Sequence, residues 1–326
     1  MNLLITRHDK IGDFVLTLPT YQVAKKQIPN VKIFALVSKV NYELASSMKF
    51  IDEVILYDEN LFTLVKRIKG KNIDASISAF TDTKLAFALF LAGVKKRYAP
   101  ATKLAQIFSN NRVKQRRSLV KMTEAEYNLD LLKAFYPKAE LKYEKPLLTF
   151  SKDEIESILL KFKKETNLVN NDYRLIAFHP GFGGSSDGNL RVDDYIKLAK
   201  SISSIKKVKV VFTFGPDDNE TKKYIEKNID FDAILYDSKS SLVDFCKLLA
   251  SFEIFVSTST GPMHLAGAVN TKTMSFFGNS LFASAKRWAT ISQKEKQSNF
   301  CVPENYDDNL YKKIENSLKE LLNETC

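Results

Sequence analysis

The sequence predicts an α/β protein built from two successive doubly wound domains, each with a parallel sheet flanked by helices. Short apolar runs typical of buried strands alternate with helical patterns along most of the chain, which indicates βαβ units. The alternation stops in a polar stretch at mid-chain and then starts again at residue 173. A chain of 326 residues is long enough for two separate cores. We therefore predict domains over 1–167 and 168–326, with their sheet edges facing a central cleft that holds the active site.

The first half shows four strand signals, and a helical pattern follows each of them. Strands are expected over 3–5, 31–37, 53–57 and 73–80, and helices from 13 onward and over 40–48, 61–68, 85–92 and 124–135. A loop is expected around 110–112. Ser151 is placed to cap a charged helix that reaches about residue 166, and the Asn-rich segment 167–172 then marks the boundary.

The second half repeats the alternation. Strands are expected over 174–178, 208–214, 233–235, 254–257 and 272–277, and helices over 192–205, 217–228, 242–250, 261–268 and 310–322.

Composition places the chain among soluble globular proteins, since 44% of its residues are hydrophobic and 27% are charged. No apolar run approaches the roughly 20 residues that a membrane span needs, and the N-terminus does not resemble a signal peptide. We therefore expect a cytoplasmic location. The three cysteines are far apart and show no CxxC spacing, so the sequence suggests neither a zinc site nor a disulfide framework.

The net charge of +11 is concentrated in one segment. Residues 84–121 contain ten Lys or Arg and no Asp or Glu. Such a segment can be a solvated face, a nucleic-acid patch, or a docking surface for an anionic substrate or a membrane. Its position inside an α/β domain favours a docking surface, and its few aromatic residues disfavour single-stranded nucleic acid.

The turn after the first strand carries a candidate catalytic residue. It lies at the carboxyl edge of the predicted sheet, where open α/β folds bind ligands. Gly12 lets the backbone approach a ligand, and Asp13 sits in the first turn of the next helix. The carboxylate is either a simple helix cap or a catalytic group. Arg7, His8 and Lys10 either border a bound hydroxyl or are surface residues beside the cap.

A Gly-rich loop after the strand at 174–178 predicts a phosphate site. Its residues Gly183, Gly184, Ser185 and Ser186 offer backbone N–H groups and hydroxyls, which suit a diphosphate. The loop is neither a Walker P-loop nor a GxGxxG fingerprint.

The stretch 256–266 is the stronger anion-binding signal. Ser259 or Thr260 is expected to cap the following helix, whose free N–H groups at Gly261 point to the sheet edge. His264 lies close by and is either a ligand contact or a packed, hydrogen-bonded residue.

Two acidic sequences remain ambiguous. Asp217 can accept hydrogen bonds from ribose hydroxyls or belong to an ordinary helix start. The Asp-Phe-Asp sequence at 230–232 is interpreted as loop chemistry, and no metal is inferred from it.

Taken in order, these motifs resemble glycosyltransferase family 9, the lipopolysaccharide heptosyltransferases. The resemblance spans nearly the whole chain, and the matching segments are 10–13 with 18–19, 51–54, 179–181, 259–266, 276–278 and 287–288.

The resemblance implies a GT-B fold, ADP-heptose as donor, inversion at the anomeric carbon, and neither a catalytic metal nor a cofactor. Asp13 matches the family's catalytic base, while Thr260, Gly261 and His264 match donor contacts. Asp217 falls where an acidic residue contacts the nucleoside. The chain departs from the family in two places: Ser259 stands where Asp is frequent, and Arg191 stands near the position of a phosphate-binding Lys.

We therefore predict an inverting, metal-independent transferase that moves heptose from ADP-L-glycero-D-manno-heptose to the Kdo/heptose inner core of lipopolysaccharide or lipooligosaccharide. Its anionic lipid A and core acceptor is expected to contact Lys10, Gly12, Arg97, Arg116 and Arg117. The enzyme would then lie peripherally on the cytoplasmic face of the inner membrane and bind no nucleic acid. The alternatives are a GT-B enzyme for another nucleotide sugar or acceptor, and a non-catalytic polyanion-binding protein.

Overall fold

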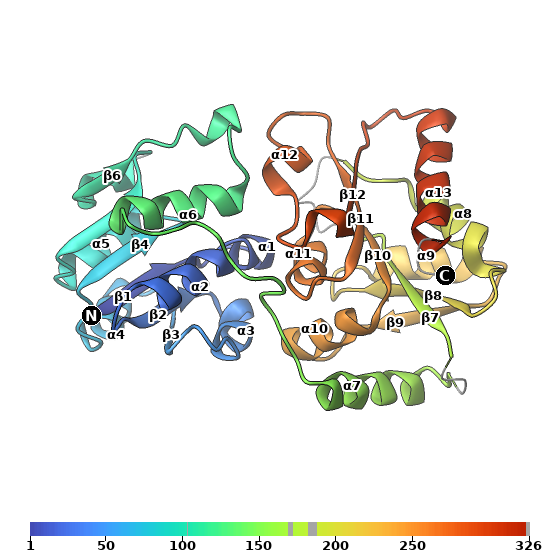
Figure 1. Ribbon diagram of the computed structural model, residues 1–326, viewed down its shortest axis with the longest axis horizontal. Helices are drawn as coiled ribbons and strands as arrows, with labels where there is room; N and C mark the ends of the chain where they lie inside the picture. Colours follow the sequence, from blue (N-terminus) through green and yellow to red (C-terminus); the bar gives the residue numbers. More distant parts are fainter. Residues whose placement is uncertain (103, 169–171, 182–187, 324–326) are drawn as a thin grey trace. The chain divides into compact units, whose positions relative to one another are not determined.

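The computed structural model describes residues 1–102, 104–168, 172–181 and 188–323. The chain forms two compact units, Met1–Leu147 and Leu148–Cys326. Each unit contains a six-stranded parallel sheet with helices on both faces (Figure 1). The prediction of an α/β protein with two doubly wound sheets is confirmed.

The N-terminal sheet has the strand order β3-β2-β1-β4-β5-β6, so β1 lies at its centre. The elements of this unit are β1 (Asn2–Thr6), α1 (Ile11–Val15), α2 (Leu18–Gln27), β2 (Lys32–Val37), η1 (Lys39–Asn41), α3 (Tyr42–Ser46), β3 (Glu53–Leu56), α4 (Leu61–Lys69), β4 (Ala75–Ser78), α5 (Thr83–Leu91), β5 (Lys96–Pro100), η2 (Leu104–Phe108), β6 (Asn111–Val113), η3 (Arg117–Leu119) and α6 (Glu124–Phe135).

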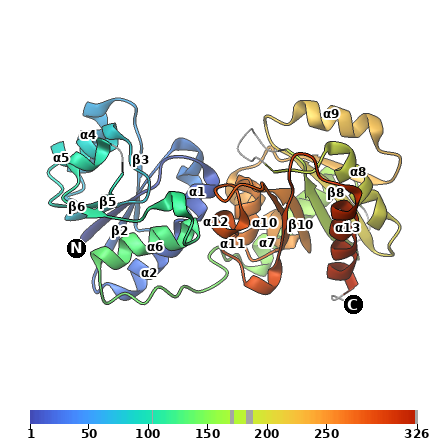
Figure 2. The ribbon, with the colours of Figure 1, turned by 90° about the horizontal axis from the view of Figure 1, so that it is seen from above.

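Apolar faces of the helices hold this sheet between two layers. Helices α4 and α5 pack together over Leu4, Phe34, Leu36 and Ile55, while α2 and α6 pack against each other as a second pair (Figures 1 and 2). Every residue of β1 after Asn2 is buried, so the central strand is fixed from both sides. The turn after β1 is therefore presented by a rigid support.

Strand β6 replaces most of the loop expected around 110–112, and β5 was not predicted. Both contain charged or polar residues, and sequence alternation does not reveal them. Strand β6 forms the edge of the sheet, where side chains reach solvent and only β5 must be matched. Strand β5 lies between β4 and β6, and its Lys96 side chain is exposed. The first helix also differs from expectation, because it begins at Ile11 and is divided into α1 and α2.

The C-terminal sheet has the strand order β12-β11-β10-β7-β8-β9. The elements of this unit are α7 (Lys152–Glu165), β7 (Arg174–His179), α8 (Val192–Ser203), β8 (Val208–Phe214), α9 (Asn219–Asn228), β9 (Ala233–Asp237), α10 (Leu242–Ser251), β10 (Ile254–Thr258), α11 (Gly261–Ala268), β11 (Lys272–Phe277), α12 (Ala285–Trp288), η4 (Lys294–Lys296), β12 (Gln297–Cys301) and α13 (Asp308–Asn323). The sequence analysis missed β12, another polar edge strand.

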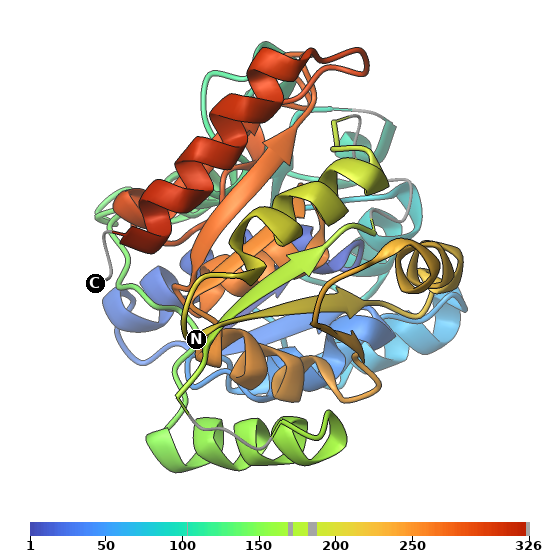
Figure 3. The same ribbon diagram turned by 90° about the vertical axis from the view of Figure 1, so that its right-hand side faces the viewer.

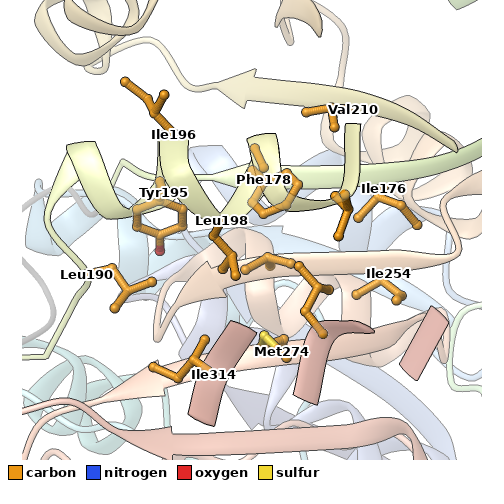
Figure 4. Packing of buried hydrophobic residues seen from close by; sticks show 14 of the residues in the cluster. Ile176, Phe178, Leu190, Tyr195, Ile196, Leu198, Val210, Ile254, Met274 and Ile314 are labelled. Carbon is orange, nitrogen blue, oxygen red and sulfur yellow. The ribbon is translucent and has the colours of Figure 1, made fainter. Parts of the chain in front are cut away.

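Helices α8 and α13 lie beside each other over the sheet (Figure 3). A large aromatic and aliphatic core lies beneath them. Leu198 of α8 and Ile314 of α13 are buried with Ile176, Ile254 and Met274 of the sheet (Figure 4). Helices α7 and α10 pack together as a separate pair. The unit is therefore a three-layer sandwich like the first.

The boundary between the units falls at Leu147–Leu148, whereas the sequence analysis placed it at 167–168. Helix α7 belongs to the C-terminal unit because its one buried residue, Phe162, packs against Tyr236 and Phe252, with ring centroids 4.9 and 6.2 Å apart. A mostly exposed helix beside an Asn-rich segment gives no sequence signal for this attachment.

Helix α12 contains Trp288, the only tryptophan of the chain. Its indole Nε1 donates to the carbonyl of Phe282 over 2.8 Å, and the Arg287 guanidinium lies 4.7 Å from its ring centroid. The indole is therefore fixed within the C-terminal unit.

Helix α6 starts with a capping box formed by Thr123 and Glu126. The Thr123 side chain accepts from the N–H of Glu126, and the Glu126 carboxylate accepts from the N–H of Thr123.

We predict that Thr123→Ala lowers the free energy of unfolding by about 1 kcal/mol because an N–H of the first turn loses its partner. Urea denaturation followed by circular dichroism measures this. Ser118→Ala, at an exposed position, is the control, and an equal loss there would contradict the capping argument.

Candidate functional site

Asp13 lies in the first turn of α1, immediately beyond the carboxyl end of β1. The N-cap residue of this helix is Lys10, whose side chain makes no capping hydrogen bond. Gly12 is buried, and the Asp13 carboxylate accepts a hydrogen bond from Nη2 of Arg7. The side chain of Asp13 thus pairs with a cation, which disfavours the interpretation of Asp13 as a simple cap.

Arg7 is the centre of a buried cluster of charges. Its Nε donates to Asp9 over 2.8 Å, and its Nη1 donates to Glu124 over 3.1 Å and to the carbonyl of Ala79 over 3.3 Å. The side chains of Arg7 and Glu124 are only 4% and 1% exposed. Burial acts to lower the Arg7 pKa, but Asp13, Asp9 and Glu124 together raise it above its ordinary value. One permanent cation therefore holds three carboxylates in place.

Burial in this cluster makes Asp13 a stronger base than an ordinary carboxylate. Loss of hydration raises its pKa to about 6, against the opposing attraction of Arg7. A carboxylate with this pKa is largely ionised at neutral pH, and it accepts a proton more readily than an exposed aspartate. The arrangement suits a general base.

Arg117 joins the same cluster through Glu124. Its Nη1 donates to Glu124 over 2.5 Å, its Nε donates to Gln115 over 2.8 Å, and its guanidinium lies 5.4 Å from the ring centroid of Tyr127. The adjacent Arg116 is exposed, with a left-handed backbone at φ 47°. Of the predicted acceptor contacts, Arg117 is thus connected to the Asp13 cluster, and Lys10 and Gly12 adjoin it in the chain.

Arg97 occupies a different place. The strand register aligns Arg97 with Ser76 and with Leu4, the middle residue of β1, and β5 lies two strands away from β1. Its guanidinium donates to the carbonyls of Phe108 and Val94. The structure therefore engages the Arg97 side chain away from the Asp13 cluster.

A second, partly buried cluster adjoins β1 and was not predicted. Nε2 of His8 lies 2.9 Å from Oδ2 of Asp82, which also accepts from the Tyr57 hydroxyl over 3.2 Å. The rings of His8 and Tyr57 stack with centroids 4.2 Å apart. Burial acts to raise the Asp82 pKa, but hydrogen bonds from His8 and from the N–H of Leu85 lower it to about 2. The carboxylate is thus ionised and fixes the orientation of the imidazole.

The sequence contained a weak signal for two of the missed residues. Asp82 is an N-cap, and Glu124 is the first residue of a helix with a capping box. Both were therefore visible as helix starts. Their contacts with His8 and Arg7 depend on tertiary structure, which spacing does not reveal.

In the C-terminal unit, the predicted loop residues Gly183, Gly184, Ser185 and Ser186 lie outside the described residues. The strand before this loop ends at His179, whose Nδ1 lies 3.1 Å from Oγ1 of Thr213. Its Nε2 is 3.7 Å from Oδ2 of Asp218, and burial lowers the pKa of this imidazole.

Asp218, rather than Asp217, is the carboxylate that lies beside His179 at the end of β7. Asp218 accepts from the N–H of Gly215 over 2.7 Å, whereas Asp217 is exposed. A Cβ at Gly181 would lie 2.0 Å from the Asp218 carboxylate, so a side chain at 181 would displace it. The nucleoside role predicted for Asp217 stays a prediction.

The start of α11 differs from expectation in its capping. Thr260 is the N-cap, but no described side chain caps the helix, since the Thr260 hydroxyl donates to the carbonyl of Thr258 over 3.3 Å. Ser259 uses its N–H to pair with the carbonyl of Phe276 over 3.0 Å. Thr260 therefore occupies the predicted N-cap position, but the expected side-chain capping bond is not formed. An uncapped start leaves the first-turn N–H groups for an anion.

His264 is buried in α11 and neutral. Burial lowers its pKa to about 4, and its Nδ1 has no hydrogen-bond partner within the described part of the chain. An uncharged imidazole can donate or accept one hydrogen bond at a ligand without adding charge.

Arg191 is the N-cap residue of α8, and an internal carboxylate holds its side chain. Its Nε lies 2.8 Å from Oδ2 of Asp194, and its guanidinium lies 4.6 Å from the ring centroid of Tyr306. The proposed phosphate contact through Arg191 stays a prediction. Among the described residues, no group of three or more His, Cys, Asp or Glu is arranged to hold a metal ion.

We predict that the Asp13 carboxyl titrates near pH 6, which carbon-detected NMR of labelled protein measures. Because its folded pKa lies above its unfolded value, Asp13 stabilises the fold most at low pH and loses this contribution as pH rises from about 4 to 6. Over that range the wild type should lose roughly 3 kcal/mol of unfolding free energy relative to Asp13→Asn. A constant difference between the two proteins across this range would contradict the raised pKa.

Comparison with known proteins agrees with this architecture. A "Putative glycosyltransferase" of Haemophilus influenzae is 35% identical over 98% of this chain and 95% of its own length. The lipooligosaccharide heptosyltransferase 2 of the same organism is 25% identical over 85% of this chain and 83% of its length. The solved structure of E. coli ADP-heptose lps heptosyltransferase II superposes with a TM-score of 0.82 at 19% identity, covering 100% of both chains.

The expected GT-B fold is confirmed by that superposition. The family model described as "Glycosyltransferase family 9 (heptosyltransferase)" matches residues 61–318, and this match includes the basic segment, the His179 turn and the start of α11. The chain therefore belongs to glycosyltransferase family 9.

Proposed function

We propose that this glycosyltransferase transfers heptose from ADP-L-glycero-D-manno-heptose to the inner core of lipopolysaccharide or lipooligosaccharide, with inversion at the anomeric carbon. The observation that carries the proposal is Asp13, a carboxylate with a pKa of about 6 that buried Arg7 holds at the end of β1. The relatives named above as heptosyltransferases support this donor and acceptor class.

The start of α11 is the proposed diphosphate site. Its first-turn N–H groups have no described side-chain cap, and the helix dipole adds partial positive charge there. Thr260, Gly261 and neutral His264 are the proposed donor contacts, with Ser259 beside them. These groups offset part of the charge of the sugar diphosphate, and the proposed reaction uses no metal and no cofactor.

The N-terminal unit is the proposed acceptor site. Lys10, Gly12 and Arg117 lie in or next to the Asp13 cluster, and Arg116 is exposed beside Arg117. Guanidinium groups bind carboxylates and phosphates in a bidentate manner, which suits Kdo and lipid A. Such an acceptor is membrane-bound, so we place the enzyme peripherally on the cytoplasmic face of the inner membrane. No helix of the described ranges is long and apolar enough to cross a bilayer.

In the proposed mechanism Asp13 removes the proton from the acceptor hydroxyl as its oxygen attacks the anomeric carbon. The bond to the diphosphate breaks on the opposite side, so configuration inverts. General-base assistance of this kind contributes roughly 10²–10⁴-fold to the rate. The N–H groups of α11 stabilise the negative charge that develops on the leaving diphosphate.

A second candidate keeps this chemistry with another nucleotide sugar. Ser259 replaces the acidic residue frequent in the resemblance, and Arg191 is paired with Asp194. Both departures lie at the proposed donor site. Family membership argues against the alternative of a non-catalytic polyanion-binding protein.

Calorimetric titration with ADP, UDP and GDP, followed by the matching nucleotide sugars, tests the donor. The proposal expects selective binding of ADP and ADP-heptose. Selective binding of UDP or GDP would replace the heptose donor by another sugar, and absence of binding to any of them would contradict a nucleotide-sugar enzyme.

We predict that Asp13→Asn lowers kcat by roughly 10²–10⁴-fold and leaves the affinity for ADP unchanged, because only the proton acceptor is lost. The kcat/KM of the wild type should fall about tenfold per pH unit below pH 6. Steady-state kinetics and calorimetry measure both effects.

Asp9→Asn is the matched control, since it removes a second carboxylate that pairs with Arg7. An equal loss of kcat in this variant would mean that the charge balance around Arg7 matters and that Asp13 is not the base.

A further inference from the structure

An exposed apolar surface with a basic margin lies on the N-terminal unit, outside the proposed catalytic site. It consists of Phe90 and Leu91 at the end of α5, and Leu104 and Ile107 of η2, all exposed. Helix α5 packs against η2, so these side chains belong to one patch. Leu104 and Ile107 are 75% and 64% exposed, which is unusual for neighbouring large aliphatic residues.

Aromatic contacts fix the shape of this patch. Phe108 of η2 packs against Phe87 and Phe90 of α5, with ring centroids 5.0 and 6.0 Å apart. The Arg97 guanidinium lies 5.5 Å from the ring centroid of Phe90 and donates to the carbonyl of Phe108 over 2.6 Å. The exposed apolar side chains are thus supported by packed aromatic rings.

Hydrogen bonds also fix the segments that carry the cations bordering the patch. The side chain of Asn110 donates to the carbonyl of Lys95 over 2.7 Å and accepts from the N–H of Arg97 over 2.8 Å. Arg112 follows, and its Nε donates to the carbonyl of Ser109 over 3.1 Å. The charged groups of Lys95, Lys96 and Arg112 are exposed, and none forms an ion pair with a described residue.

The charge of the surrounding segment is one-sided. Residues 84–121 contain no Asp or Glu, and Asp82 and Glu59 near the start of α5 are engaged with the N–H of Leu85 and with Lys84. A partner for this surface must therefore supply negative charge around an apolar interior.

We propose that the surface formed by Phe90, Leu91, Leu104, Ile107, Lys95, Lys96 and Arg112 docks on the surface of an anionic lipid bilayer. Aliphatic and aromatic side chains bury themselves at the acyl boundary, while Lys and Arg pair with lipid phosphates. This inference rests on the proposed function only in that a lipid-linked acceptor lies at a bilayer. The lipid headgroups bound here are distinct from the acceptor, since the patch lies where α5 ends and β5 begins, whereas Asp13 follows the carboxyl end of β1.

Sedimentation of the full-length protein with phosphatidylcholine vesicles, with and without phosphatidylglycerol, tests the proposal. We expect binding to the anionic vesicles that weakens as salt increases, and little binding to phosphatidylcholine alone. Equal binding to both compositions, or binding to neither, would overturn the proposal. Binding to RNA in the absence of vesicle binding would also overturn it.

Two pairs of variants separate the contributions of charge and apolar surface. Lys95→Gln/Lys96→Gln should weaken anionic vesicle binding roughly 10- to 30-fold, whereas Lys312→Gln/Lys313→Gln on α13 removes the same charge from exposed positions elsewhere. Leu104→Ser/Ile107→Ser should weaken binding to anionic vesicles about tenfold. Leu160→Ser/Leu281→Ser is its control, at residues 63% and 50% exposed. Equal losses in test and control variants would overturn the assigned surface.

Calorimetry with ADP distinguishes this inference from the proposed function. The four variants should bind ADP like the wild type, since none alters a proposed donor contact. Vesicle binding without ADP binding would support the docking surface and contradict the donor, and the reverse result would overturn the docking surface alone.

Discussion

The N-terminal unit depends on one buried cation. Arg7 follows the central strand of the sheet, and its guanidinium touches Asp9, Asp13 and Glu124. Removing charges from water costs several kcal/mol per ion, so such a cluster is retained only where its geometry is well satisfied. It connects the end of β1, the first turn of α1 and the start of α6, and it keeps a weakly acidic carboxylate at the carboxyl edge of the sheet.

In the proposed function the two units bind anions by different means. The N-terminal unit would use side-chain charge, with arginines that are partly neutralised by internal carboxylates. The C-terminal unit would use backbone dipoles at α11, beside a neutral His264. A buried neutral imidazole and uncapped N–H groups avoid the desolvation cost of a buried cation, which suits a ligand that must bind and leave repeatedly.

The sequence predicted the elements that have a clear hydrophobic pattern and missed the strands that are rich in polar residues. Buried strands such as β1 and β10 are continuous apolar runs, so their places were clear. The polar edge strands β6 and β12, and β5 next to β6, lacked that signal because they contain charged or polar residues that reach solvent. Asp13 was identified from its turn and from the family resemblance. Its partner Arg7 lies 117 residues from Glu124, another carboxylate that Arg7 binds, and no local spacing relates them.

Trp288 makes the two units spectroscopically unequal. The chain has no other tryptophan, so indole fluorescence arises from the C-terminal unit alone, where Arg287 and Phe282 surround the ring. Excitation at the red edge of the absorption band therefore produces no fluorescence from the N-terminal unit. Its 147 residues still contribute fully to the far-UV circular dichroism of the backbone. A mismatch between the two optical readouts during denaturation would be the signature of units that melt independently.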